Sequence, residues 1–186
     1  MARVPYVSRE SLPPDQQQYF DQIAGKRGHV APPFAALLNS PAAAARVAAV
    51  GEQLRYVSPS ISPDMREIVT LTVTRELRCQ YIWTHHVFSA REAGVREEVI
   101  NVIRDGAAVT SLKPHESALV LFTRELLKNN RVSDATFTSV QAPLGRQATV
   151  DLVLIIGYYG LMCHVANALD IELEEDVAPL LPDAPR

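Results

Sequence analysis

Two serine–proline pairs divide the chain into segments, and both have the form of a helix start. Ser40-Pro41 and Ser62-Pro63-Asp64 place a serine at the capping position and a proline at the first helical position. Proline is tolerated there because the first N–H groups of a helix have no partner within the helix. Pro114 opens a further segment in the same way. Repeated starts of this kind predict a series of consecutive helices.

Apolar residues recur at helical spacing after these starts. We predict helices over residues 15–24, 42–56, 63–77, 80–92, 96–104, 115–128 and 147–169, with a shorter one starting at 133–134. No segment alternates apolar and polar residues over a useful length, as a half-buried strand would. The sequence therefore predicts an all-α fold of about seven to nine helices. The Pro32-Pro33 pair is expected to keep residues 26–34 in a loop.

The last predicted helix is apolar over residues 150–169, a length that could span a membrane. Asp151, His164 and Asn167 lie within this stretch and argue against a span. We expect instead a helix that is buried in the bundle or shared with a second subunit. Its apolar surface is more than one 186-residue bundle readily covers, which predicts a homo-oligomer.

Composition and charge limit the class of partner. The chain has 18 Lys and Arg against 21 Asp and Glu, and the formal net charge of −3 favours neither nucleic acid nor an anionic membrane surface. No glycine-rich phosphate-binding motif occurs, so a nucleotide cofactor is not expected. The first ten residues lack the apolar stretch of a signal peptide, so we expect a cytoplasmic protein.

We expect one domain over residues 1–186, with a core at about 40–170, an extended arm at 1–14 and a solvated tail at 171–186. The two cysteines, Cys79 and Cys163, are 84 residues apart, a separation that fits reduced thiols better than a disulfide scaffold. No metal site is expected, because three histidines stand apart from any second ligand at helical spacing: His29, His115 and His164.

One short stretch, residues 76–86, holds the only tryptophan of the chain, one of its two cysteines and two of its five histidines. If Cys79 begins a helix, Ile82 and His86 follow it on one face, at three and seven residues. Trp83 flanks that face, whereas His85 points partly away, together with Tyr81. A free cysteine is more often a small buried apolar residue than a functional one.

The residue types of this stretch suit two kinds of chemistry. A cysteine at a helix N-terminus lies at the positive end of the helix dipole, which favours its thiolate. A histidine two turns later can take or give a proton near neutral pH. Glu67 lies on the preceding predicted helix, and an antiparallel turn would bring it alongside.

The spacing of Glu67, Cys79 and His86 resembles that of the carboxymuconolactone decarboxylase and alkylhydroperoxidase D family. In the peroxidase branch of that family the signature is Glu-x11-Cys-x-x-Cys-x-x-x-His. The similarity also covers segments outside the motif: residues 4–6, 62–67, 90–95 and 167–169. The resemblance implies an alkylhydroperoxidase D-like helical bundle, a small-molecule substrate, and trimers or hexamers with the active site close to a subunit interface, although dimers also stay open.

The chain departs from this signature at the second cysteine. Ile82 occupies that position, and Tyr81 occupies the place of an intervening histidine. Ile82 has no thiol with which to resolve a sulfenic acid, so the dithiol cycle of the peroxidase branch is absent. Cys163 could act in its place only if the fold brings it beside Cys79, which the sequence does not show.

The decarboxylase branch, as the resemblance implies, works without a metal or organic cofactor, and we expect no cofactor here. His86 would be the acid/base for decarboxylation or isomerisation of a small carboxylated or lactone substrate, with Glu67 as its partner. Two alternatives stay open: a thiol-dependent peroxidase that uses Cys79 alone, and a family member without catalytic activity. The candidate pocket residues are Tyr81, Ile82, Trp83 and His85, and the candidates for holding a substrate carboxylate are Arg66 and Arg78.

Overall fold

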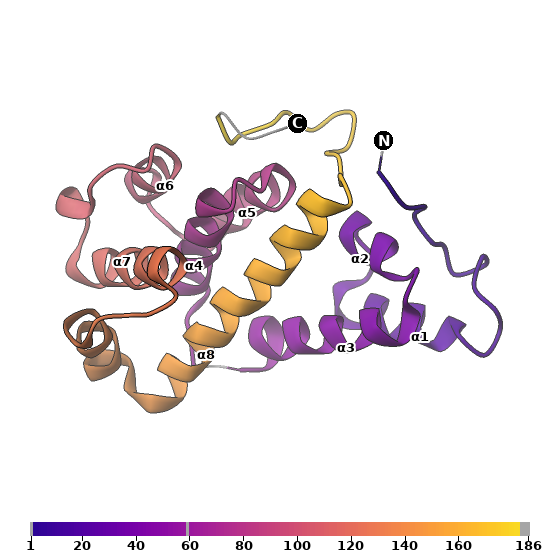
Figure 1. Cartoon of the computed structure of the whole chain (residues 1–186), viewed down its shortest axis with the longest axis horizontal. Coiled ribbons are helices and arrows are strands. Elements are labelled where there is room, and N and C mark those ends of the chain that lie inside the picture. Colours follow the sequence, from indigo (N-terminus) through magenta and orange to yellow (C-terminus); the bar gives the residue numbers. More distant parts are fainter. Residues whose placement is uncertain (1, 59, 183–186) are drawn as a thin grey trace. The chain divides into compact units, whose positions relative to one another are not determined.

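The computed structural model describes residues 2–58 and 60–182, and every regular element among them is helical (Figure 1). This part of the chain contains eight α-helices, which confirms the predicted all-α class. The chain divides into two compact units. Unit 1 comprises residues 1–58 and 164–172, and unit 2 comprises residues 59–163 and 173–186.

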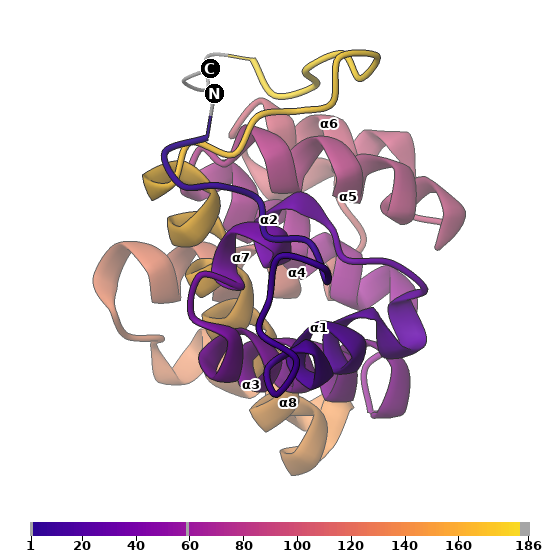
Figure 2. The same ribbon diagram turned by 90° about the vertical axis from the view of Figure 1, so that its right-hand side faces the viewer.

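Unit 1 contains three α-helices: α1 (Gln17–Ala24), α2 (Pro32–Leu37) and α3 (Pro41–Glu52). Short turns extend the first and the last of them: the 3₁₀ turn η1 (Gly25–Arg27) and the π-helical turn η2 (Gln53–Val57). The predicted N-terminal arm is held on α2, where the Val7 N–H donates to the Ala35 carbonyl oxygen at 3.0 Å (Figure 2). Ile23 of α1 is completely buried, in agreement with the predicted apolar stripe of that helix.

The predicted loop over residues 26–34 is wrong in its second half. Pro32 and Pro33 stand in the first turn of α2, after Ala31 in an extended conformation. Neither proline removes a helical hydrogen bond at these positions, and their fixed φ suits a helix start. The prolines therefore begin a helix where the sequence prediction took them to break one.

Unit 2 is organised around α4 (Pro63–Glu76), which packs against α5 (Gln80–Glu92), α6 (Glu97–Arg104) and α7 (Pro114–Asn129). Every residue from Glu67 to Thr74 is buried, so this helix has no solvent face along its middle. The hydroxyl groups of its three threonines donate hydrogen bonds to backbone carbonyl oxygens of the same helix: Thr70, Thr72 and Thr74. These hydroxyl groups are thus satisfied within α4, which allows the helix to lie inside the bundle.

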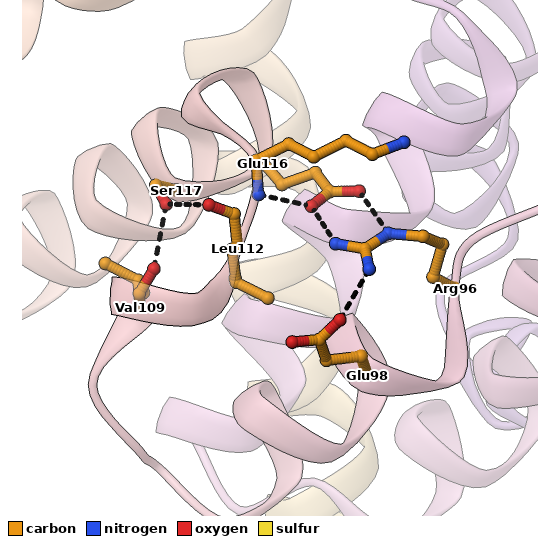
Figure 3. Close-up of polar contacts among 7 residues, drawn as sticks. Arg96, Glu98, Val109, Leu112, Glu116 and Ser117 are labelled. Atoms are coloured by element: carbon orange, nitrogen blue, oxygen red, sulfur yellow. Dashed lines mark hydrogen bonds and ion pairs between the residues drawn. The ribbon is translucent and has the colours of Figure 1, made fainter.

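An ion pair connects the start of α6 to the start of α7 (Figure 3). Arg96, which precedes α6, donates to both carboxylate oxygens of Glu116, at 3.1 and 2.7 Å. Glu116 also accepts the backbone N–H of Lys113 at 2.8 Å and so caps α7. Between the two helices lies the 3₁₀ turn η3 (Val109–Ser111), whose Val109 carbonyl oxygen accepts the Ser117 hydroxyl proton.

The last helix, α8 (Asp134–Ala168), is broken at Gly145, where φ is 80° and ψ is 175°. Glycine adopts this left-handed backbone without the strain that a side chain would cause. The break separates a short first helix from a long second one, which agrees with the predicted starts at 133–134 and 147.

Beyond its break, α8 presents two apolar faces. One is buried and carries Leu152, Ile155, Ile156, Tyr159, Met162 and Cys163. The other is exposed and carries Val150, Val153, Leu154 and Leu161. By length and composition α8 could cross a membrane, but core helices of water-soluble proteins satisfy the same criteria, and 44% of its most apolar window is buried.

Candidate active site

The candidate site is built on the hairpin of α4 and α5. Arg78 adopts a left-handed conformation with φ of 50°, and the Cys79 N–H donates to the Thr74 carbonyl oxygen at 2.8 Å. The chain thus leaves α4 and begins α5 within three residues. Cys79 stands at the N-cap of α5 and accepts the Trp83 N–H on its carbonyl oxygen, so the predicted helix start at this cysteine is confirmed.

The hairpin brings Glu67 of α4 against His86 of α5. The Nδ1 atom of His86 lies 2.6 Å from the Oε2 atom of Glu67. The Glu67 side chain is 1% exposed, whereas the His86 side chain keeps 12% of its surface exposed. Because a carboxylate accepts only, this contact assigns the Nδ1 proton to His86 and makes Nε2 the ring nitrogen for proton exchange with a substrate.

A guanidinium compensates the buried carboxylate on its other side. The Nε atom of Arg66 lies 3.5 Å from the Oε1 atom of Glu67, and the Arg66 side chain is 11% exposed. A buried carboxylate costs several kcal/mol in lost hydration unless cations and hydrogen bonds compensate it. Glu67 therefore lies between an imidazole and a guanidinium, which fixes its position.

An aromatic residue of α8 packs against the imidazole. The rings of His86 and Tyr159 meet edge to face, with centroids 4.9 Å apart. Tyr158 contacts Tyr159 in a similar arrangement at 5.2 Å. Sequence reasoning missed Tyr159, although it is a polar-tipped residue within the apolar face of the last predicted helix.

Cys79 lies in the same hairpin, and its side chain is completely buried. The thiol of Cys163, on α8, is hydrogen-bonded to it and lowers the pKa of Cys79, and the backbone N–H groups of Ile82 and Tyr81 lower it further. The sequence also predicts a lowered pKa for Cys79, on the ground of its position at a helix N-terminus. The largest cause, however, is Cys163, whose place near Cys79 the sequence could not show. Contact with Cys79 together with burial raises the pKa of Cys163.

Tyr81 and His85 face a residue of the C-terminal tail. The Tyr81 hydroxyl donates to the Oε1 atom of Glu174 at 3.1 Å, and the Nε2 atom of His85 lies 3.0 Å from Oε2 of the same carboxylate. Leu181 is buried, and the Leu180 N–H donates to the Thr84 hydroxyl. The tail is thus anchored on α5 at Glu174, Leu180 and Leu181, whereas residues 175–179 between these points are mostly exposed, as predicted for a solvated tail.

The other predicted residues differ in their surroundings. Ile82 is buried, and Trp83 is completely buried with an indole N–H that has no hydrogen-bond partner, which makes Trp83 a core residue. Arg78 is exposed at the hairpin turn. Of the predicted set, the structure brings Glu67, His86 and Arg66 into contact.

Within the described residues, no group of three or more His, Cys, Asp or Glu side chains is arranged to hold a metal ion. The isolated histidine His115 lies exposed in the first turn of α7.

Comparison with known proteins agrees with this fold. Residues 41–125 match the model of the carboxymuconolactone decarboxylase family. This matched segment covers a little less than half of the chain. The segment includes α4, α5 and α6, and with them Glu67, Cys79 and His86.

Solved structures share the fold over nearly the whole chain. An alkylhydroperoxidase AhpD core protein from Ralstonia eutropha JMP134, an uncharacterized peroxidase-related protein, has a TM-score of 0.75 at 19% identity, covering 94% of this chain and 93% of its own. A peroxidase-related protein from Silicibacter sp. TM1040 has a TM-score of 0.73 at 16% identity, covering 94% and 91%. The debrominase Bmp8 has a TM-score of 0.70 at 14% identity, covering 87% of each chain.

A comparison with curated proteins finds no significant match. At these identities the structural neighbours establish the fold alone: an all-helical, AhpD-core-like arrangement. The carboxymuconolactone decarboxylase family includes enzymes.

Proposed function

We propose that this carboxymuconolactone decarboxylase-like protein is a cofactor-independent enzyme that transfers a proton to or from carbon on a small carboxylated or lactone substrate. The contact between His86 Nδ1 and Glu67 Oε2 is the observation that carries the proposal. It holds one tautomer of an imidazole that is still partly exposed, as proton transfer to a bound molecule requires.

In a decarboxylation, the bond between carbon and the departing carboxylate breaks, CO2 leaves, and the electron pair stays on the substrate as a dienolate. The protonated His86 then gives its Nε2 proton to carbon and becomes neutral. Glu67 keeps the Nδ1 proton in place and stabilises the imidazolium before transfer. The exposed face of Tyr159 is small, so this ring mainly limits the orientation of the imidazole.

The alternative of a peroxidase that uses Cys79 alone receives less support from the surroundings of this thiol. Its side chain is completely buried and has Cys163 as its neighbour, so a thiol reaction at Cys79 would involve a second cysteine of the same chain. The alternative of a non-catalytic protein is opposed by the buried Glu67–His86 pair, which an inactive core would not need.

The proposal is tested with a panel of unsaturated lactone carboxylic acids that begins with carboxymuconolactone, by following CO2 release. We expect the wild-type protein to release CO2 from at least one of them without added metal or cofactor. His86→Ala should lower that rate by about 10²–10⁴-fold, the usual contribution of a positioned acid/base. His115→Ala, which removes an exposed histidine of α7, is the matched control and should keep the wild-type rate. Failure of the whole panel would favour the non-catalytic alternative.

A further inference from the structure

Unit 1 contains a pocket of about 270 Å³ between α1 and the stretch formed by α3 and the π-helical turn η2. This volume exceeds the cavity of about 150 Å³ that accommodates benzene in an engineered protein core, so a small organic molecule fits. π-Helical turns are rare, and they occur frequently at functional sites. The pocket is lined by Gln22, Ala45, Ala49, Glu52, Gln53 and Val57.

The lining combines three apolar side chains with three polar ones, and Glu52 is the one charged residue among the six. Sites for small molecules have this character, because apolar groups contact the body of the ligand and a few polar groups fix its orientation. The amides of Gln22 and Gln53 each offer donors and an acceptor, whereas the Glu52 carboxylate only accepts. The charge that the pocket presents to a ligand is therefore negative.

The position of Glu52 strengthens this negative charge. Glu52 is the last residue of α3, and neither α3 nor α1 has a basic residue in its last turn. A side chain on Gly25, the C-cap of α1, would approach the Oε2 atom of Glu52 to 3.8 Å, so the carboxylate lies at the C-terminal ends of both helices. The C-terminal end of a helix carries partial negative charge, which disfavours a carboxylate there and favours a cation.

The cations that the chain itself supplies approach Glu52 loosely. The Nζ atom of Lys26 lies 3.7 Å from Oε1, and the Nη1 atom of Arg27 lies 3.9 Å from Oε2, both beyond the range of a hydrogen bond to a carboxylate. Arg27 is engaged elsewhere, since its Nη2 atom donates to the Ala48 carbonyl oxygen at 2.7 Å and its guanidinium lies over the Phe34 ring. The Lys26 side chain is 57% exposed and can move aside. The carboxylate thus retains acceptor capacity for a cation that enters the pocket.

We propose that this pocket binds a small organic ammonium ion, with the ammonium group at Glu52 and a short apolar chain against Ala45, Ala49 and Val57. An ammonium group has three N–H donors, which suit a carboxylate and the amide oxygens beside it. Calcium and magnesium ions fit less well, because they take six or more oxygen ligands and the lining has one carboxylate. The site uses neither Glu67 nor His86, so it is independent of the proton-transfer proposal.

Amide NMR of the isotope-labelled protein, titrated with n-butylammonium chloride, tests the site. We expect saturable shifts over residues 17–27 and 41–58, with a dissociation constant in the millimolar range or lower, as the small size of the ligand allows. Butanol and butyrate have the same apolar chain without the positive charge, and both should bind at least about tenfold more weakly. Potassium chloride at the same concentration is the control for ionic strength.

Three variants locate the binding site. Glu52→Gln keeps the shape of the side chain and should weaken n-butylammonium binding by about 10–100-fold, the loss expected for a charge-assisted hydrogen bond. Ala49→Leu fills the pocket with a good helix former and should abolish binding. Glu92→Gln removes an exposed carboxylate of α5, in unit 2, and should bind as the wild type does.

Three results would overturn the inference. One is a wild-type protein whose amide signals show no saturable shift, or whose shifts centre on α5. Another is a protein that binds butanol or butyrate as tightly as n-butylammonium. The third is binding of n-butylammonium that Ala49→Leu leaves unchanged. The comparison of the three probes requires no substitution, so it decides the question even if a variant fails to fold.

Discussion

The Nδ1 atom of His86 lies 2.6 Å from the Oε2 atom of Glu67, across the hairpin of α4 and α5. The carboxylate is buried to 1% exposure and the imidazole keeps 12%. A buried acceptor behind a partly exposed imidazole fixes the ring and its tautomer while the opposite nitrogen serves the reaction. Glu67 is thus a positioning residue, and His86 is the residue that we expect to touch the substrate.

Replacing Glu67 by glutamine tests this division of roles. We expect Glu67→Gln to lower kcat by up to about 10⁴-fold, since an amide can hold the wrong tautomer of the imidazole. The change should fall mainly on kcat and not on KM, and nitrogen NMR of the imidazole should show the Nδ1 proton displaced. An unchanged kcat together with an unchanged tautomer would remove Glu67 from the mechanism.

The anchoring of the C-terminal tail depends on Glu174. Its carboxylate accepts the Tyr81 hydroxyl proton and contacts His85, so Glu174→Ala should release residues 173–179 from α5, whereas Leu180 and Leu181 keep their own contacts. We expect faster amide hydrogen exchange and proteolysis in this segment. The loss of global stability should be below about 1 kcal/mol, because the contact with His85 is exposed. Glu175→Ala, one residue further along the exposed chain, is the control and should change neither.

The Glu116 carboxylate predicts a pH dependence of stability. The Arg96 guanidinium, followed by the Lys113 backbone N–H, holds the pKa of Glu116 below its ordinary value of 4.5. The unfolded chain therefore takes up this proton more readily than the native protein. The contribution of Glu116 to stability is complete at a pH above the pKa of this residue in the unfolded chain. It is lost as the pH falls through the lower pKa of Glu116 in the folded protein.

Urea unfolding of Glu116→Gln measures this effect. At about pH 7 we expect the free energy of unfolding of the variant to be lower than that of wild type by about 0.5–2 kcal/mol, the range for losing a helix cap. The difference from wild type should shrink once the pH is below the folded pKa. Glu97→Gln, which breaks an exposed pair with Arg91, should stay within about 0.5 kcal/mol of wild type. A difference for Glu116→Gln that is constant over the whole pH range would contradict the assignment.

The exposed apolar face of α8 predicts self-association. Val150, Val153, Leu154 and Leu161 are each between 41% and 58% exposed, and they recur along one side of the helix. We propose that a second copy of the chain covers them, and we expect light scattering to give a mass well above 20.5 kDa at micromolar concentration. Leu154→Asp should shift the protein towards monomer, whereas Asn129→Asp, at the exposed end of α7, should not. A wild-type monomer would contradict this proposal.

Local signals account for the parts of the fold that the sequence predicts. A proline in the first turn marks where α3, α4 and α7 begin, and α5 covers residues 80–92 as predicted. The predicted serine caps, Ser40 and Ser62, stand at the N-cap positions but make no side-chain capping hydrogen bond. The contact of Glu67 with His86 is also foreseeable, because α4 and α5 are neighbours in sequence joined by a short turn. The same reasoning failed at α2, where two prolines in the first helical turn were taken for a helix break.

Contacts between segments that are far apart in the chain could not be predicted from the sequence. Cys163 and Tyr159 approach α5 only through the packing of α8, and helical periodicity gives the buried face of α8 but not its neighbour. The attachment of Glu174 to Tyr81 depends on the path of a tail without regular structure. For this reason the sequence allowed Cys163 as a partner of Cys79 but could not show whether the two residues lie close together.

The central claim is that His86 performs the proton transfer, and its most direct test compares His86→Ala with Cys79→Ala on the same substrate. We expect His86→Ala to lower kcat by about 10²–10⁴-fold, whereas Cys79→Ala should keep most of the activity. Loss of turnover in Cys79→Ala, with His86→Ala almost as active as wild type, would contradict the account.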